Sequence, residues 1–156
     1  MYEWLLFFHL LGAFSFFAGA AVAAVGQLVA LRRERPSEIA LVLGLTRWGV
    51  LLVGIGALST IGFGSWLVAY LPHWTFRQAW IEWAFVLWVA AMAVGGIGGR
   101  PARRARELAQ RRAAEGDRPS AELHRAIAAP LPLALSFASG AILVAIVVLM
   151  VWKPGV

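Results

Sequence analysis

Four long apolar stretches, separated by shorter polar segments, dominate the pattern of hydrophobic and polar positions along the 156-residue chain. We expect them to be membrane-spanning helices over residues 4–31, 39–71, 78–99 and 131–152. At a helical rise of about 1.5 Å per residue, each is long enough to cross a hydrocarbon core of roughly 30 Å. The pattern therefore predicts an all-α membrane protein, built as one domain with a four-transmembrane-helix bundle.

The polar segments predict where helices begin and end. Residues 32–38 carry three arginines, and Ser37 after Pro36 indicates a helix start with Ser37 as the N-cap. Residues 100–129 form the longest polar segment and carry eight arginines against four acidic residues. We expect this loop to continue the third span as a surface helix to Ala114, followed by a turn over residues 116–120.

Basic residues gather at one end of the predicted spans. Twelve arginines lie in or beside residues 32–47 and 100–125, whereas Arg77 and Lys153 are the basic residues of the opposite end. Because lysine and arginine are retained in cytoplasmic loops, we expect both arginine-rich segments in the cytoplasm and both termini on the outer, extracytoplasmic side.

Composition narrows the classes of site and partner. Hydrophobic residues make up 61% of the chain, the net charge is +6, and cysteine is absent. The lack of cysteine excludes disulfides, iron–sulfur clusters and thiolate metal sites. Because the positive charge lies beside membrane spans, we expect a lipid bilayer partner, with anionic lipids at Arg100–Arg125, and no nucleic acid.

One face of the first span is expected to point into the bundle. With about 100° per residue, one side of this helix carries His9, Phe16, Ala20, Ala23 and Gln27, flanked by Gly12, Gly19 and Gly26. Small residues allow close approach of a neighbouring helix. The second span carries a matching ridge of Gly56, Thr60 and Gly64.

Three titratable residues are candidates for a site at the outer side, namely His9, His73 and Glu82. A neutral imidazole can ligate haem iron or a soft metal, and a carboxylate can orient its second nitrogen. One hypothesis is a haem b or metal site with His9 as ligand, Glu82 as its partner and His73 as a second ligand. The alternative is that His9 only donates a hydrogen bond across the bundle, to Glu82 or to a backbone carbonyl.

Catalytic motifs are not evident in the chain. It contains no phosphate-binding loop, nucleophile elbow, zinc-protease motif or hydrolase carboxylate pair. A proton relay would need protonatable groups across the membrane, and the inner half of the spans offers only hydroxyl and amide side chains. The sequence therefore does not predict an enzyme.

Five short stretches, residues 5–13, 27–32, 65–68, 78–81 and 151–155, resemble the bacterial integral membrane family called domain of unknown function 2269. The likeness extends over nearly the whole chain and implies a multi-pass protein of the bacterial plasma (inner) membrane. That family has no assigned activity.

The first span also resembles the copper-resistance D proteins and the HemJ-type protoporphyrinogen oxidases. In the latter a first-helix histidine ligates haem, and His9 is the matching position, so the resemblance implies haem or copper for His9. Phe16 stands where these relatives often have tryptophan, and the third span lacks the lysine on which the oxidase type relies.

Two functional hypotheses follow. The first, which the abundance of packing and topology features favours, is a non-catalytic accessory or interaction subunit. Its glycine ridges and arginine segment would pack against other membrane subunits or a second copy of the chain. The alternative is a b-type haem or metal-binding protein in redox or cofactor handling, through His9.

Overall fold

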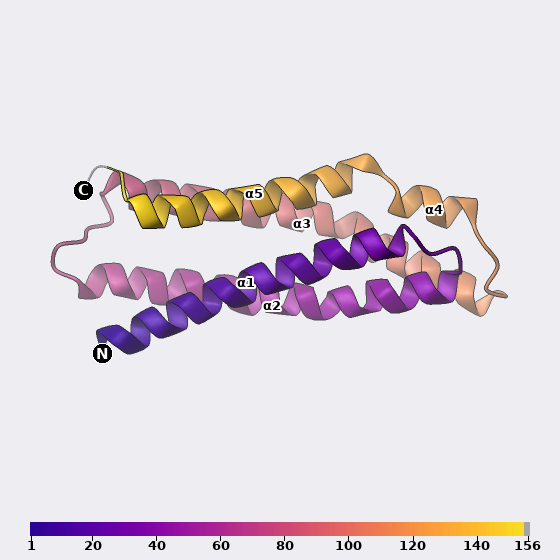
Figure 1. Cartoon of the computed structure of the whole chain (residues 1–156), viewed down its shortest axis with the longest axis horizontal. Helices are drawn as coiled ribbons and strands as arrows, with labels where there is room; N and C mark the ends of the chain where they lie inside the picture. Colours follow the sequence, from indigo (N-terminus) through magenta and orange to yellow (C-terminus); the bar gives the residue numbers. More distant parts are fainter. Residues whose placement is uncertain (155–156) are drawn as a thin grey trace.

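The computed structural model describes residues 1–154, apart from the side chain of Pro132, and these residues form five α-helices and no strand (Figure 1). The helices are α1 (Tyr2–Ala30), α2 (Pro36–Tyr70), α3 (Ala79–Ala114), α4 (Ala121–Ile127) and α5 (Pro130–Trp152). Within this part of the chain, all except α4 include a stretch long and apolar enough to cross a membrane. The expected all-helical architecture with four spans is therefore confirmed.

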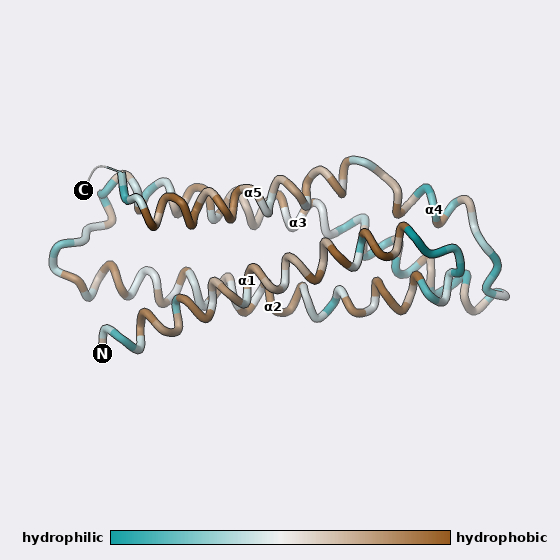
Figure 2. The backbone as a smooth tube through the Cα atoms, in the orientation of Figure 1, coloured by the Kyte–Doolittle hydropathy of each residue, from teal (hydrophilic) through white to brown (hydrophobic). Residues whose placement is uncertain are grey.

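The four long helices are arranged as two hairpins, α1 with α2 and α3 with α5 (Figure 1). Both termini lie at one end of the molecule, and the α1–α2 connection and α4 lie at the other. Figure 2 shows that hydrophilic residues gather at this second end. The chain therefore brings its two arginine-rich segments together, and we call this end the arginine end and the opposite one the termini end.

Glycines allow α1 and α2 to touch through their backbones. A Cβ added to Gly19 would overlap the carbonyl oxygen of Gly49, and a Cβ on Gly49 would lie 2.8 Å from the carbonyl oxygen of Gly19. A Cβ on Gly56 would overlap the amide nitrogen of Phe16 and lie 2.6 Å from the Gly12 carbonyl oxygen. The inward-facing small residues expected on both spans thus pack against each other.

A central apolar cluster joins the two hairpins. It draws one or two buried side chains from each long helix, namely Phe16, Ala57, Ala91, Leu143 and Ile146. The hydroxyl of Ser139 on α5 also donates to the carbonyl oxygen of Ala91 on α3, at 3.2 Å. Of the α1 face expected to point inward, His9, Phe16 and Gln27 are buried.

A second apolar core lies at the arginine end. The 35 residues of α2 and 36 of α3 extend about 50 Å, far beyond the roughly 30 Å hydrocarbon core. Their surplus turns pack with α4 and the end of α1 around Ala30, Ile39, Leu43, Ala105, Ala109, Leu123 and Ile127. The buried side chain of Gln27 donates to the carbonyl oxygen of Ile127 at 3.0 Å. Residues 100–114 are helical as expected, whereas α4 was not anticipated.

The N-terminus of α2 is capped differently from the sequence expectation. The helix begins at Pro36, so Ser37 lies inside its first turn and is not the N-cap. Asp117, from the α3–α4 turn, accepts from the amide of Ser37 with Oδ1 and from its hydroxyl with Oδ2, each at 2.7 Å. Capping from a distant segment satisfies a free amide of the helix start. These hydrogen bonds lower the pKa of Asp117 below its ordinary value.

The backbone contact of α1 with α2 predicts a sharp difference between two glycines of α2. Gly56→Ala adds a methyl group against backbone atoms of α1, so we expect it to lower the free energy of unfolding by about 1–3 kcal/mol. Gly54 has no atom within 4 Å of an added Cβ, so Gly54→Ala should leave it unchanged or raise it by up to about 1 kcal/mol. Thermal unfolding in mild detergent measures both. Equal midpoints would refute the tight crossing.

The contact between Asp117 and Ser37 predicts a pH-dependent stability difference. Because the folded pKa lies below the usual value, the carboxylate stabilises the fold above that value, and this contribution is lost as the pH falls through the lowered pKa. We expect Asp117→Asn, which tolerates the positive φ of 52° at this position, to lower the unfolding temperature at pH 7. The gap from the wild type should close at acidic pH. Glu34→Gln, in the neighbouring connection, is the control and should behave as the wild type throughout.

Candidate functional site

His9 lies in α1, facing α2, and its imidazole is held by a backbone group. Its Nδ1 lies 2.9 Å from the carbonyl oxygen of Thr60. Because a carbonyl only accepts, Nδ1 carries the proton and Nε2 presents a lone pair. Gly64 provides the room, since a Cβ there would lie 2.9 Å from both Cε1 and Nδ1 of His9. The partner of His9 is therefore the backbone carbonyl, one of the two partners considered from the sequence.

The imidazole lines a cavity of about 370 Å³ in the termini half of the bundle. All four long helices contribute to its wall, and the wall is mostly apolar. Its polar side chains include His9, Thr60, Ser65, Trp80, Trp88 and Lys153. The cavity thus combines an apolar body with a few polar groups, as is usual for small-molecule sites.

Two tryptophans of α3 present unused hydrogen-bond donors. The indole nitrogens of Trp80 and Trp88 are buried and have no hydrogen-bond partner in the described part of the chain. Trp80 is only 5% exposed. A buried polar group without a partner costs about 1–3 kcal/mol, and both tryptophans belong to the cavity wall.

Lys153 follows the last turn of α5 and covers aromatic rings at the termini end of the cavity. Its Nζ lies 4.8 Å from the ring centroid of Trp74 and 5.8 Å from that of Trp80. The residue has a φ of 42°, and this left-handed conformation ends α5. An ammonium group above indole rings is attracted by their negative faces. The result is a cation held over the tryptophans at the cavity wall.

Glu82 and His73, the two other residues expected at the site, lie away from the cavity. Glu82 is exposed and His73 is an exposed residue of the α2–α3 connection, with its ring edge-on to Trp74. Neither belongs to the cavity wall. Glu82 follows Trp80 by two residues and therefore points about 200° away from it around α3.

The turn of about 100° per residue also identifies the cavity residues that the sequence interpretation missed. Trp80, Ala84 and Trp88 are spaced by four, so they share the inward face of α3, and all three line the cavity. Their spacing was the available signal in the sequence. Among the described residues, no group of three or more histidine, cysteine and carboxylate side chains could hold a metal ion.

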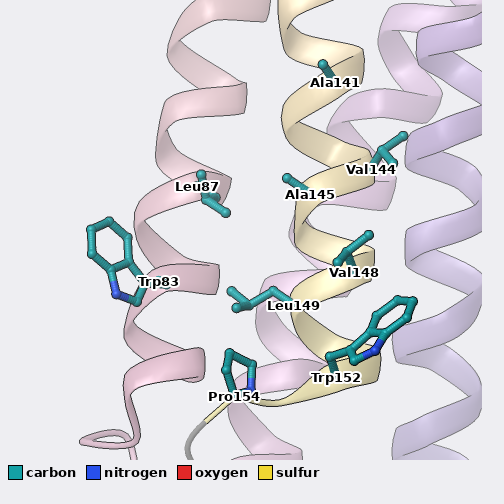
Figure 3. Close-up of a pocket in the computed structure, with 9 residues that line it drawn as sticks. All are labelled: Trp83, Leu87, Ala141, Val144, Ala145, Val148, Leu149, Trp152 and Pro154. Carbon is teal, nitrogen blue, oxygen red and sulfur yellow. The ribbon is translucent and has the colours of Figure 1, made fainter.

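A second hollow, of about 610 Å³, lies on the outer surface between α3 and α5 (Figure 3). Leu87 and Leu149 lie between the two helices, and Trp83 and Trp152 lie at its margins. Its side chains are almost entirely apolar and none is titratable. In a bilayer this hollow suits acyl chains and offers no chemistry.

Comparison with known proteins assigns the chain to a family. No curated protein and no solved structure matches the chain. A family model described as "Predicted integral membrane protein (DUF2269)" matches residues 3–154, nearly the full length and all four spans. The chain therefore belongs to this DUF2269 family of integral membrane proteins.

Proposed function

We propose that the protein is a non-catalytic membrane protein that binds a small, largely apolar molecule in the cavity around His9. The observation that carries this proposal is the cavity wall itself. His9 offers a lone pair on Nε2, and two buried indoles offer N–H groups without partners. A volume of about 370 Å³ lies within the 300–1,000 Å³ range of small-molecule sites.

Packing supports the same conclusion. Helices packed only for stability fill the space between them, because each methyl-sized void lowers stability. In this bundle buried apolar side chains form the central cluster and the core of the arginine end, whereas the termini half retains a mostly apolar cavity with a few polar groups in its wall. A ligand that accepts hydrogen bonds would satisfy those groups.

Haem b is a second candidate for the ligand, and one contact favours it. The hydrogen bond from Nδ1 to the Thr60 carbonyl leaves Nε2 as the ligating atom, in the way that outer partners orient metal-bound histidines. His9 would be the single protein ligand, because His73 and Glu82 are outside the cavity wall. The cavity volume is at the small end of the ligand range, which favours a smaller molecule over a macrocycle.

An accessory role in a membrane complex would use other surfaces than those expected from the sequence. The glycines of the α1 ridge and Gly56 are occupied by the contact between α1 and α2. The exposed arginines of α3 beyond Arg100 remain available for anionic lipid head groups or for a cytoplasmic partner.

The site also has a proposed side of the membrane. The positive-inside rule makes the arginine end cytoplasmic, so the termini end and the His9 cavity belong to the outer half of a bacterial inner membrane. The ligand would then enter from the outer leaflet.

Filling the cavity tests the proposed function. Ala13 lines the cavity, whereas Ala18 is an exposed residue of the same helix. We expect Ala13→Phe to lose most of any ligand that co-purifies with the wild type in mild detergent, as measured by native mass spectrometry. Ala18→Phe, which adds the same ring toward lipid, should retain the ligand. The absorption spectrum of the same samples tests haem, for which a Soret band lost in His9→Ala but kept in His73→Ala is required.

Two outcomes are decisive for this experiment. Equal ligand content in Ala13→Phe and Ala18→Phe would refute the cavity as the binding site. A colourless wild type with a bound organic ligand would exclude haem and leave the proposed function intact.

Membrane orientation can be tested without removing native thiols, because the chain has no cysteine. Thr75 and Glu34 are exposed residues of the two opposite ends. In intact spheroplasts we expect a membrane-impermeant maleimide to label Thr75→Cys, and to label Glu34→Cys only after permeabilisation. The reverse pattern would contradict the proposed orientation.

A further inference from the structure

Lys153 places a positive charge at the termini end of the cavity. The ammonium of Lys153 lies over Trp74 and Trp80, and the buried Trp80 N–H has no hydrogen-bond partner among residues 1–154. These three side chains, which we call the Lys153 cluster, line the same cavity. A charged donor and an indole thus belong to side chains that line one part of the cavity, and no acidic side chain lines it.

Among residues 1–154, the Lys153 cluster also has no acidic partner. The residues that line the cavity include no aspartate or glutamate, and within the described chain the ion pairs all lie at the arginine end. Glu82, a nearby acid on α3, faces away from the cavity. Partial desolvation of a cation favours an anionic neighbour, and an anion held by a charged donor makes a strong hydrogen bond.

The remainder of the cavity suits a hydrocarbon chain. From Trp80 the wall extends to Trp88 and His9, and those eight residues of α3 correspond to about 12 Å. Aliphatic and aromatic side chains form most of this wall, and Val147 and Val151 of α5 are exposed residues at its edge. Since α1 and α5 touch only sparsely, the seam between them is a route from the bilayer.

From these observations we infer that the cavity binds an anionic single-chain amphiphile, a long-chain carboxylate, with its head group at the Lys153 cluster. The chain runs along α3 toward His9, and the carboxylate accepts from Lys153 Nζ. This inference rests on the proposed function and adds the chemical class of the ligand. It assigns Lys153 the role of head-group residue.

Photocrosslinking in a bilayer tests the ligand class. The probe is a stearic acid with a diazirine in its chain, added to protein in nanodiscs of zwitterionic phosphatidylcholine. We expect label on cavity residues such as Leu6, Leu10 and Val147, mapped by peptide mass spectrometry. Unlabelled oleic acid should compete, whereas methyl oleate, which lacks the charge, should not.

Matched variants isolate the head-group contact. Lys153→Gln should reduce labelling of the cavity by about tenfold, since it removes a hydrogen bond to a charged group. Trp80→Phe, which replaces the indole beneath the Lys153 ammonium by a smaller ring, should reduce it severalfold. Arg77→Gln neutralises the other basic residue of the termini end, which does not line the cavity, and should leave the labelling unchanged.

The contradicting outcomes separate this inference from the proposed function. Competition by methyl oleate equal to that by oleic acid would overturn the anionic head group, and so would labelling of Lys153→Gln at the wild-type level. Stronger competition by octadecyl phosphate than by oleic acid would replace the carboxylate by a phosphate. In each case loss of label in Ala13→Phe would still support a ligand in the cavity. Label confined to the hollow beside Trp83 and Trp152, unaffected by Ala13→Phe, would overturn both.

Discussion

The backbone contact between α1 and α2 is the constraint on which the remaining structure depends. Lipid supplies no hydrophobic drive to associate two apolar helices, so their attraction comes from close packing, and glycine permits the closest packing. Gly19 against Gly49, and Gly56 against Gly12, bring the two helices together along much of their length. The same closeness brings His9 to the carbonyl oxygen of Thr60 and leaves Gly64 as the space for its ring. The geometry of the candidate site is therefore a consequence of the hairpin that contains it.

The second hairpin meets the first in a less uniform way, and this difference creates the cavity. At the arginine end, α4 and the surplus turns of α2 and α3 surround a closed core, and Asp117 ties that end to the start of α2. In the middle, Phe16 and Ala57 meet Leu143 and Ile146. α1 and α5 touch only sparsely, and large tryptophans of α3 line the cavity to which both helices contribute. A closed core at one end thus accompanies a mostly apolar cavity with a few polar groups at the other.

Much of the fold could be predicted from hydrophobic length alone, and much of the site could not. Uninterrupted apolar runs have few alternatives to a membrane helix, because every backbone polar group must be satisfied within the span. The position of a residue along a helix can be predicted by counting residues, and on this basis Glu82 and His9 were both expected at the outer side of the membrane. Direction around the helix axis needs the position of the neighbouring helices, and Glu82 proved to face outward while Trp80 and Trp88 face the cavity. The pairing of Ser37 with Asp117 joins segments 80 residues apart, so local capping rules assigned Ser37 the wrong role.

By itself the sequence determined that this is a four-span helical membrane protein, that its arginines gather at one end, and that one face of the first span is turned inward. These properties follow from composition and helical periodicity, which are local along the chain. The tertiary structure alone decided the partner of His9, the orphaned indoles and the position of Lys153 over two tryptophan rings. Each of these features requires side chains from different helices to meet, and their meeting depends on crossing geometry set by residues distant in sequence.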